Sequence, residues 1–128
     1  VHNRMVDAEL GPFRLSLRAA VSDGRWWDEA EPLWVTVQRH GLRSAAMFWP
    51  GTEARINGVR PNDWLPYAGD KPHKARVDRV LRWLDRDEER RPHFITLYFA
   101  AFDEESHAHG ADSAESVAAL RDIDASLA

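Results

Sequence analysis

Two stretches of the chain have the apolar, β-branched and aromatic composition of buried β-strands. His93–Ala100 (HFITLYFA) carries little polarity at its centre, which is typical of a strand that is covered on both faces. Arg43–Trp49 (RSAAMFW) is a weaker strand, and the Pro50-Gly51 pair after it predicts a turn. The pattern therefore predicts two strands that lie far apart in the sequence.

Three other stretches have the features of helices. Glu31–His40 contains a proline suited to a first helical turn and precedes a glycine suited to a helix end. Pro72–Asp87 and Asp112–Ala128 are the other two, and Asp112 or Ser113 is the expected N-cap of the last one. These two stretches place apolar residues on one face at helical spacing, namely Val77, Val80, Leu81 and Leu84 in the first and Val117, Leu120, Ile123 and Leu127 in the second.

The order of these elements is helix, strand, helix, strand, helix, which favours the α/β class. Alternation of this kind predicts right-handed crossovers and a parallel sheet with helices on both faces. Arg4–Glu29 and Pro50–Lys71 have no clear period, so we expect irregular chain in both. The length of 128 residues fits a single domain.

Composition excludes several classes of function. A net charge of -4 argues against binding to duplex nucleic acid through bulk electrostatics. The absence of cysteine excludes disulfides and thiolate zinc sites. No apolar run reaches the length of a membrane span. The six tryptophans are large aromatic surfaces that belong in a core or in a pocket.

The stretch AFDEESHAHG, which follows the stronger strand, is the first candidate for chemistry. Ligands of open α/β sheets bind beyond the carboxyl ends of the strands. Asp103 and His107 are four residues apart and can converge on one ion if the intervening turn is helical, and zinc accepts oxygen and nitrogen ligands. Alternatively, Asp103 caps a solvated loop and His107 is a surface histidine. The spacing alone leaves both interpretations open.

A possible aromatic pocket is the second candidate. Trp49, Pro50 and Tyr67 could line it, although Trp49 could equally fill the core. Tyr98 lies within the strand and is a core residue by default, and Asn3 could donate its amide to an anion. No nucleophile elbow or phosphate-binding glycine loop occurs in the sequence. The residues by themselves therefore indicate a metal half-site and a pocket, but not an enzyme.

Several motifs in their common order resemble a known family. The motifs that carry the resemblance are EPLWVTVQRHGLRSAAMFWPGTEARINGVRPNDWLPY, RVDRVLRWLD, RPHFITLYF and D-x-x-x-H-x-x-G. In these motifs the chain resembles the nucleotide pyrophosphatase/phosphodiesterase family of the alkaline phosphatase superfamily. The resemblance runs over essentially the whole chain. It implies that residues 1–128 are a central fragment of a catalytic domain, without a second domain, and form part of an alkaline-phosphatase-like sheet.

The resemblance also implies a zinc-dependent hydrolase of nucleotide phosphodiester and pyrophosphate bonds. Asp103 and His107 match ligands of one of two zinc ions, and Asn3 matches an asparagine that contacts a phosphate oxygen. Tyr98 matches the aromatic residue that stacks on the nucleobase. The other residues that match the lining of the nucleotide pocket are Trp49, Pro50, Tyr67 and Leu15.

The family's nucleophilic threonine and its other zinc ligands have no counterpart in this chain. We therefore expect the segment to require the remainder of the catalytic domain and to be inactive alone, with a small-molecule phosphodiester as the substrate of the parent enzyme. The family also favours a periplasmic or secreted location. A non-catalytic α/β module that binds a nucleotide-like aromatic ligand is the alternative.

The chain departs from the family pattern beside the expected zinc ligands. Ser106 stands where the family has glycine, and serine resists a positive φ. Ala111 replaces a common proline, and Ala100 or Ala101 replaces a common acidic residue. We expect Ser106 to affect the placement of His107, and the three departures together to weaken the zinc half-site.

Overall fold

The computed structural model describes residues 3–128. The chain begins with an antiparallel hairpin of β1 (Arg4–Asp7) and β2 (Gly11–Arg14). Two short helical turns follow, α1 (Arg18–Val21) and η1 (Gly24–Trp26). The expectation of irregular chain between Arg4 and Glu29 was therefore wrong. Each strand of the hairpin has four residues, which are too few to show a clear alternation of apolar and polar positions.

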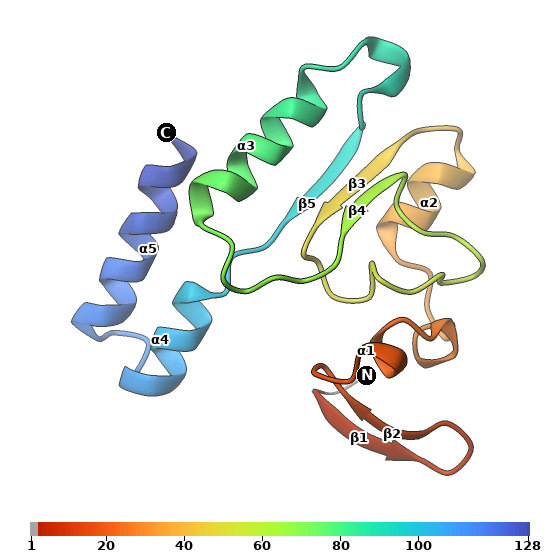
Figure 1. Cartoon of the computed structure of the whole chain (residues 1–128), viewed down its shortest axis with the longest axis horizontal. Helices are drawn as coiled ribbons and strands as arrows, with labels where there is room; N and C mark the ends of the chain where they lie inside the picture. Colours follow the sequence, from red (N-terminus) through yellow and green to blue (C-terminus); the bar gives the residue numbers. More distant parts are fainter. Residues whose placement is uncertain (1–2) are drawn as a thin grey trace.

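A parallel sheet of three strands forms the centre of the molecule (Figure 1). Its order is β4 (Asp63–Leu65), β3 (Ser44–Met47) and β5 (Phe94–Leu97). The two strands predicted from the sequence lie next to each other, with Ala45 opposite Ile95. The third strand, β4, falls within the stretch that we expected to be irregular, so that expectation was also wrong.

Helices cover both faces of the sheet, as the alternation predicts. α2 (Leu33–Arg39) packs Trp34 and Val35 into a cluster that includes Phe94. α3 (His73–Leu84) packs Trp83 against Ala45 and Met47, which belong to a second cluster. Successive strand residues point to opposite faces, so β5 supplies Phe94 to the first cluster and Ile95 and Leu97 to the second.

The stretch after β5 is a helix and not a solvated loop. Three residues separate β5 from α4 (Ala101–His109), and α5 (Ala114–Leu127) packs against both α4 and α3. Ser113 is the N-cap of α5, as predicted, and accepts a hydrogen bond from the Ser116 N–H. Ser106 lies inside α4 and does not have a positive φ. The expected backbone conflict at Ser106 is therefore absent.

The apolar stripes predicted on two helices are only partly buried. Leu81 and Leu84 of α3 are exposed, and the deeply buried residues of this helix are Arg76 and Trp83. Leu120 and Leu127 of α5 are also exposed. Between residues 3 and 128 no helix is long and apolar enough to cross a membrane.

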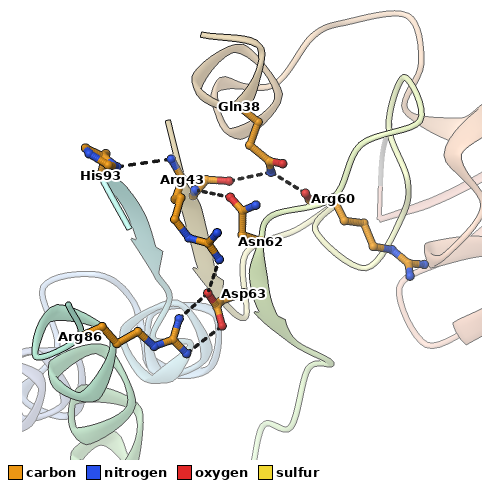
Figure 2. A network of polar contacts seen from close by, with 8 residues as sticks. Gln38, Arg43, Arg60, Asn62, Asp63, Arg86 and His93 are labelled. Carbon is orange, nitrogen blue, oxygen red and sulfur yellow. Dashed lines mark hydrogen bonds and ion pairs between the residues drawn. The ribbon is translucent and has the colours of Figure 1, made fainter. Parts of the chain in front are cut away.

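A polar network joins the amino ends of the three strands (Figure 2). Asp63 of β4 accepts two hydrogen bonds from the Arg86 guanidinium, at 2.6 and 2.9 Å, and Arg43 lies 3.8 Å from the same carboxylate. The Ser44 N–H donates to Asn62 Oδ1 at 2.9 Å, and the Arg43 N–H donates to His93 Nδ1 at 3.4 Å. These contacts fix the strands at the edge opposite their carboxyl ends.

Replacing Asp63 with asparagine should lower the free energy of unfolding by about 1–2 kcal/mol, because the partly buried Arg86 guanidinium loses its charged, two-point acceptor. Urea titration would measure the loss. Asp78→Asn is the matched control: its carboxylate pairs with an exposed Lys74, so less than about 0.5 kcal/mol should be lost. Equal losses in the two variants would contradict a stabilising role of the network.

Candidate functional site

An aromatic cavity of about 390 Å³ lies at the carboxyl ends of the three strands. The five residues predicted to line a nucleotide pocket all line this cavity, namely Leu15, Trp49, Pro50, Tyr67 and Tyr98. Its wall also includes Phe48, Thr52, Glu53 and Leu65. Residues from the hairpin region, from the turn after β3, from the chain around β4 and from the end of β5 therefore meet in one place.

The turn after β3 presents Trp49 to the cavity. Thr52 is buried, and its hydroxyl donates to the Trp49 carbonyl at 2.6 Å. Gly51 has a φ of +84°, and a Cβ there would lie 3.2 Å from the Trp27 ring. These contacts fix the turn and leave Trp49 42% exposed. The alternative in which Trp49 fills the core was therefore wrong.

The residue before this turn has an unusual backbone. Phe48 is buried and has a φ of 64°, a value that bulky residues rarely adopt. Its ring joins the same apolar cluster as Ala45 and Met47, so the strand's alternation breaks at this residue. The next residue, Trp49, therefore lies at the cavity and not in the core.

Two tyrosines form the aromatic wall. The Tyr67 and Tyr98 ring centroids are 6.5 Å apart, and the Tyr67 ring meets Phe48 edge-on at 5.5 Å. The Tyr67 N–H donates to Glu53 Oε1 at 2.9 Å, which ties the chain after β4 to the turn after β3. The ring faces of Tyr67 and Tyr98 are surfaces on which a planar heterocycle can stack.

Burial raises the pKa of the Tyr98 phenol above its ordinary value of 10.0, and the nearby charge of Asp103 raises it further. Tyr67 and Glu104 act in the same direction, and the Arg76 guanidinium opposes them. The phenol is therefore neutral at physiological pH. The influence of Asp103 also links α4 electrostatically to the cavity wall.

In a spectrophotometric titration near 295 nm, Tyr98→Phe should remove the absorbance step whose midpoint lies above pH 10. Tyr67 and Tyr98 are the two tyrosines of the chain, so the assignment is direct. Because the unfolded chain releases the Tyr98 proton at a lower pH than the folded protein, this ionisation should favour unfolding as the pH rises past about 10. If Tyr98→Phe instead removes an absorbance step whose midpoint lies below pH 10, the result would contradict the burial of the phenol.

The two predicted metal ligands lie one helical turn apart on α4. His107 Nε2 is 3.6 Å from Asp103 Oδ1, and the two side chains are 82% and 67% exposed. An open imidazole and an open carboxylate on one face fit two positions of a zinc site. The described part of the chain, residues 3–128, holds no group of three or more His, Asp or Glu side chains that could bind a metal. These residues thus fit half of a site.

Asn3 and His109 complete the list of candidates. Asn3 is exposed, and its carbonyl accepts a hydrogen bond of 3.4 Å from the N–H of the cavity residue Leu15. His109 Nε2 lies 3.5 Å from Glu105, in an exposed pair that repeats the Asp103–His107 spacing further along α4.

Sequence reasoning missed the roles of Phe48, Glu53 and Arg76 at this site. No residue pattern predicts a positive φ at a phenylalanine. The buried position of Arg76 had one signal, since an arginine four residues before Val80 shares that residue's helix face. Glu53 follows directly on the WPGT turn, and no local pattern predicts its hydrogen bond with the Tyr67 N–H, 14 residues further along the chain.

The comparison with known protein families agrees with this geometry. The family model described as Type I phosphodiesterase / nucleotide pyrophosphatase matches residues 1–128. The chain belongs to this family. Among curated relatives, human ectonucleotide pyrophosphatase/phosphodiesterase family member 1 is 36% identical over 124 residues, which cover 97% of this chain and 13% of the relative. Venom phosphodiesterase of Macrovipera lebetinus is 38% identical over 128 residues, which cover 99% of this chain and 15% of the relative.

Solved structures of the family share the fold. Murine ectonucleotide pyrophosphatase/phosphodiesterase 5 superimposes with a TM-score of 0.85 at 31% identity, covering 99% of this chain and 34% of that one. An inactive variant of the same enzyme, solved in complex with AMP, matches with the same score and identity. The predicted fold class, α/β with part of an alkaline-phosphatase-like sheet, is thereby confirmed. The chain spans about a third of the length of these structures.

Proposed function

We propose that this chain is the nucleotide-binding segment of a zinc-dependent enzyme that hydrolyses nucleotide phosphodiester or pyrophosphate bonds. Residues 1–128 would be a central part of its catalytic domain, and the remainder of that domain would supply the nucleophile and the other zinc ligands. The observation that carries the proposal is the convergence of Leu15, Trp49, Pro50, Tyr67 and Tyr98 on one aromatic cavity at the carboxyl ends of the strands.

In this proposal the cavity binds the base and α4 binds the metal. Tyr98 and Tyr67 offer stacking surfaces to a nucleobase, and Trp49 lines the cavity beside them. Asp103 and His107 would hold one zinc ion, whose chemistry is to polarise a phosphoryl oxygen and to activate an attacking oxygen. Asn3 would donate its amide to a phosphate oxygen. The neutral Tyr98 phenol keeps further negative charge away from a phosphate bound near Asp103.

The substrate would be a small phosphodiester that carries a nucleoside. The murine relative in complex with AMP supports a nucleotide. The relatives named as ectonucleotide and venom enzymes support an exported location for this protein as well. Duplex nucleic acid is not the proposed ligand, because the chain has a net charge of -4.

A chromogenic assay tests the proposal. The longest natural protein that contains this segment should release 4-nitrophenol from the 4-nitrophenyl ester of thymidine 5′-monophosphate. A chelator should abolish the activity and zinc should restore it. The 128-residue chain alone should not hydrolyse the ester, although it can bind the nucleotide, as the alternative of a non-catalytic module also expects. Failure of the longer protein, with or without zinc, would overturn the proposed reaction.

A further inference from the structure

Arg76 of α3 is a buried cation that contacts chain after each strand of the sheet. Its residue is 2% exposed. Nη1 donates to the Tyr98 carbonyl at 2.9 Å, Nη2 to the Gly69 carbonyl at 2.8 Å and Nε to the Lys71 carbonyl at 2.9 Å. The guanidinium carbon also lies 5.1 Å from the centre of the Phe48 ring.

The residues that contact Arg76 are, or lie close to, the aromatic residues that line the cavity after each of the three strands. Phe48 follows β3 and precedes Trp49, and the Gly69 carbonyl follows β4 and Tyr67. Tyr98 follows β5 directly. A Cβ at Gly69 would lie 3.2 Å from the Tyr67 hydroxyl, so the Tyr67 side chain rests on the backbone that Arg76 holds. Arg76 itself does not line the cavity.

The arrangement of carbonyl acceptors around this side chain suits arginine and not lysine. Three carbonyls surround the planar guanidinium, whose fork of donors is fixed, whereas a lysine ammonium is a single point on a flexible stem. No carboxylate within residues 3–128 forms an ion pair with Arg76. A buried cation without a counter-ion is tolerated only while its hydrogen bonds are made. The hydrogen bonds therefore join the segments after β4 and β5, and the contact of the guanidinium with the Phe48 ring adds the segment after β3.

Resting on the proposed function, we propose that Arg76 is a positioning residue that sets selectivity for the nucleoside part of the substrate. It holds the backbone beside Tyr67 and Tyr98 through hydrogen bonds, and it contacts the ring of Phe48, the residue before Trp49, so that the three aromatic residues keep the spacing that admits a base. It does not touch the substrate. Its loss should therefore weaken recognition of the base and spare the reaction at phosphorus.

The test compares two chromogenic diesters in the complete enzyme. One is the 4-nitrophenyl ester of thymidine 5′-monophosphate, and the other is methyl 4-nitrophenyl phosphate, which has neither a nucleoside nor a second aromatic ring. Arg76→Met should lower the ratio of their kcat/KM values about 10-fold, through a higher KM for the nucleotide, since loss of base stacking on one aromatic residue weakens binding by roughly 5- to 150-fold. Arg76→Lys, which keeps the charge but loses the fork, should also lower the ratio.

Both substrates are measured on one preparation, so a smaller folded fraction lowers both rates and leaves the ratio unchanged. If Arg76→Met yields no soluble enzyme, Arg76→Lys gives the same readout. Arg86→Met is the matched control, because it removes a hydrogen-bonded arginine at the opposite edge of the sheet. It should lower stability and leave the ratio as in the wild type.

An unchanged ratio in the Arg76 variants, with a wild-type enzyme that prefers the nucleotide, would overturn this inference and leave the proposed function intact. A full wild-type ratio in Arg76→Lys alone would overturn the claim that the fork is needed. A wild-type enzyme that treats the two diesters alike would overturn the nucleotide pocket, and this inference with it.

Discussion

Replacing Asp103 with alanine should lower zinc-dependent hydrolysis by at least about 100-fold in the complete enzyme. Loss of a partner that only supports a metal ligand commonly costs about 10- to 100-fold, and Asp103 is proposed as a ligand itself. The side chain is 67% exposed, so its removal leaves no cavity and should not destabilise the fold. The measurements are kcat/KM at a fixed zinc concentration and the zinc content of the purified protein.

The neighbouring pair on α4 gives a close control. Glu105 and His109 have the same chemistry and spacing as Asp103 and His107, and their side chains are also solvent-accessible. Glu105→Ala should retain wild-type activity and zinc content. His107→Ala should match Asp103→Ala. If Glu105→Ala and Asp103→Ala lose activity to the same extent, the assignment of the zinc ligands is wrong.

Replacing Tyr98 with alanine should raise KM for a nucleotide substrate about 10- to 100-fold. Alanine removes an aromatic surface on which a base would stack, and such stacking is worth about 1–3 kcal/mol per base. Tyr98→Phe keeps the ring, so its KM should stay near that of the wild type. The phenol is neutral in the wild type as well, because burial raises its pKa.

A substrate without a nucleoside separates binding from general damage. Hydrolysis of methyl 4-nitrophenyl phosphate should change little in Tyr98→Ala, since the Tyr98 ring is proposed to contact only the base. Equal losses on both substrates would mean that Tyr98 supports the fold or the metal site and does not recognise the base.

The elements with a clear period were predictable from the sequence. β3 and β5 have the composition of buried strands, α3 and α5 place apolar residues at helical spacing, and α2 has a proline and a glycine suited to its ends. β4 was not predictable, because three residues between Asn62 and Pro66 carry no alternation. α4 was missed because the charges of AFDEESHAH hide its period, and Ala100 makes no side-chain cap.

The pocket needed more than periodicity. Its residues run from Leu15 to Tyr98. Residue types suggested Trp49, Pro50 and Tyr67 as pocket residues, and only the resemblance to a family added Leu15 and Tyr98. The positive φ of Phe48 and the three carbonyls around Arg76 arise from long-range packing, which no local pattern encodes. The sequence did predict that Asp103 and His107 lie close together, because a helical turn brings residues four apart onto one face.

The most direct test of the nucleotide pocket is a crystal structure of the enzyme with AMP and zinc. The adenine ring should lie in the cavity between Trp49, Tyr67 and Tyr98, and an anomalous zinc peak should lie within about 2.2 Å of both Asp103 and His107. An adenine bound elsewhere, with this cavity filled by solvent, would contradict the proposed pocket.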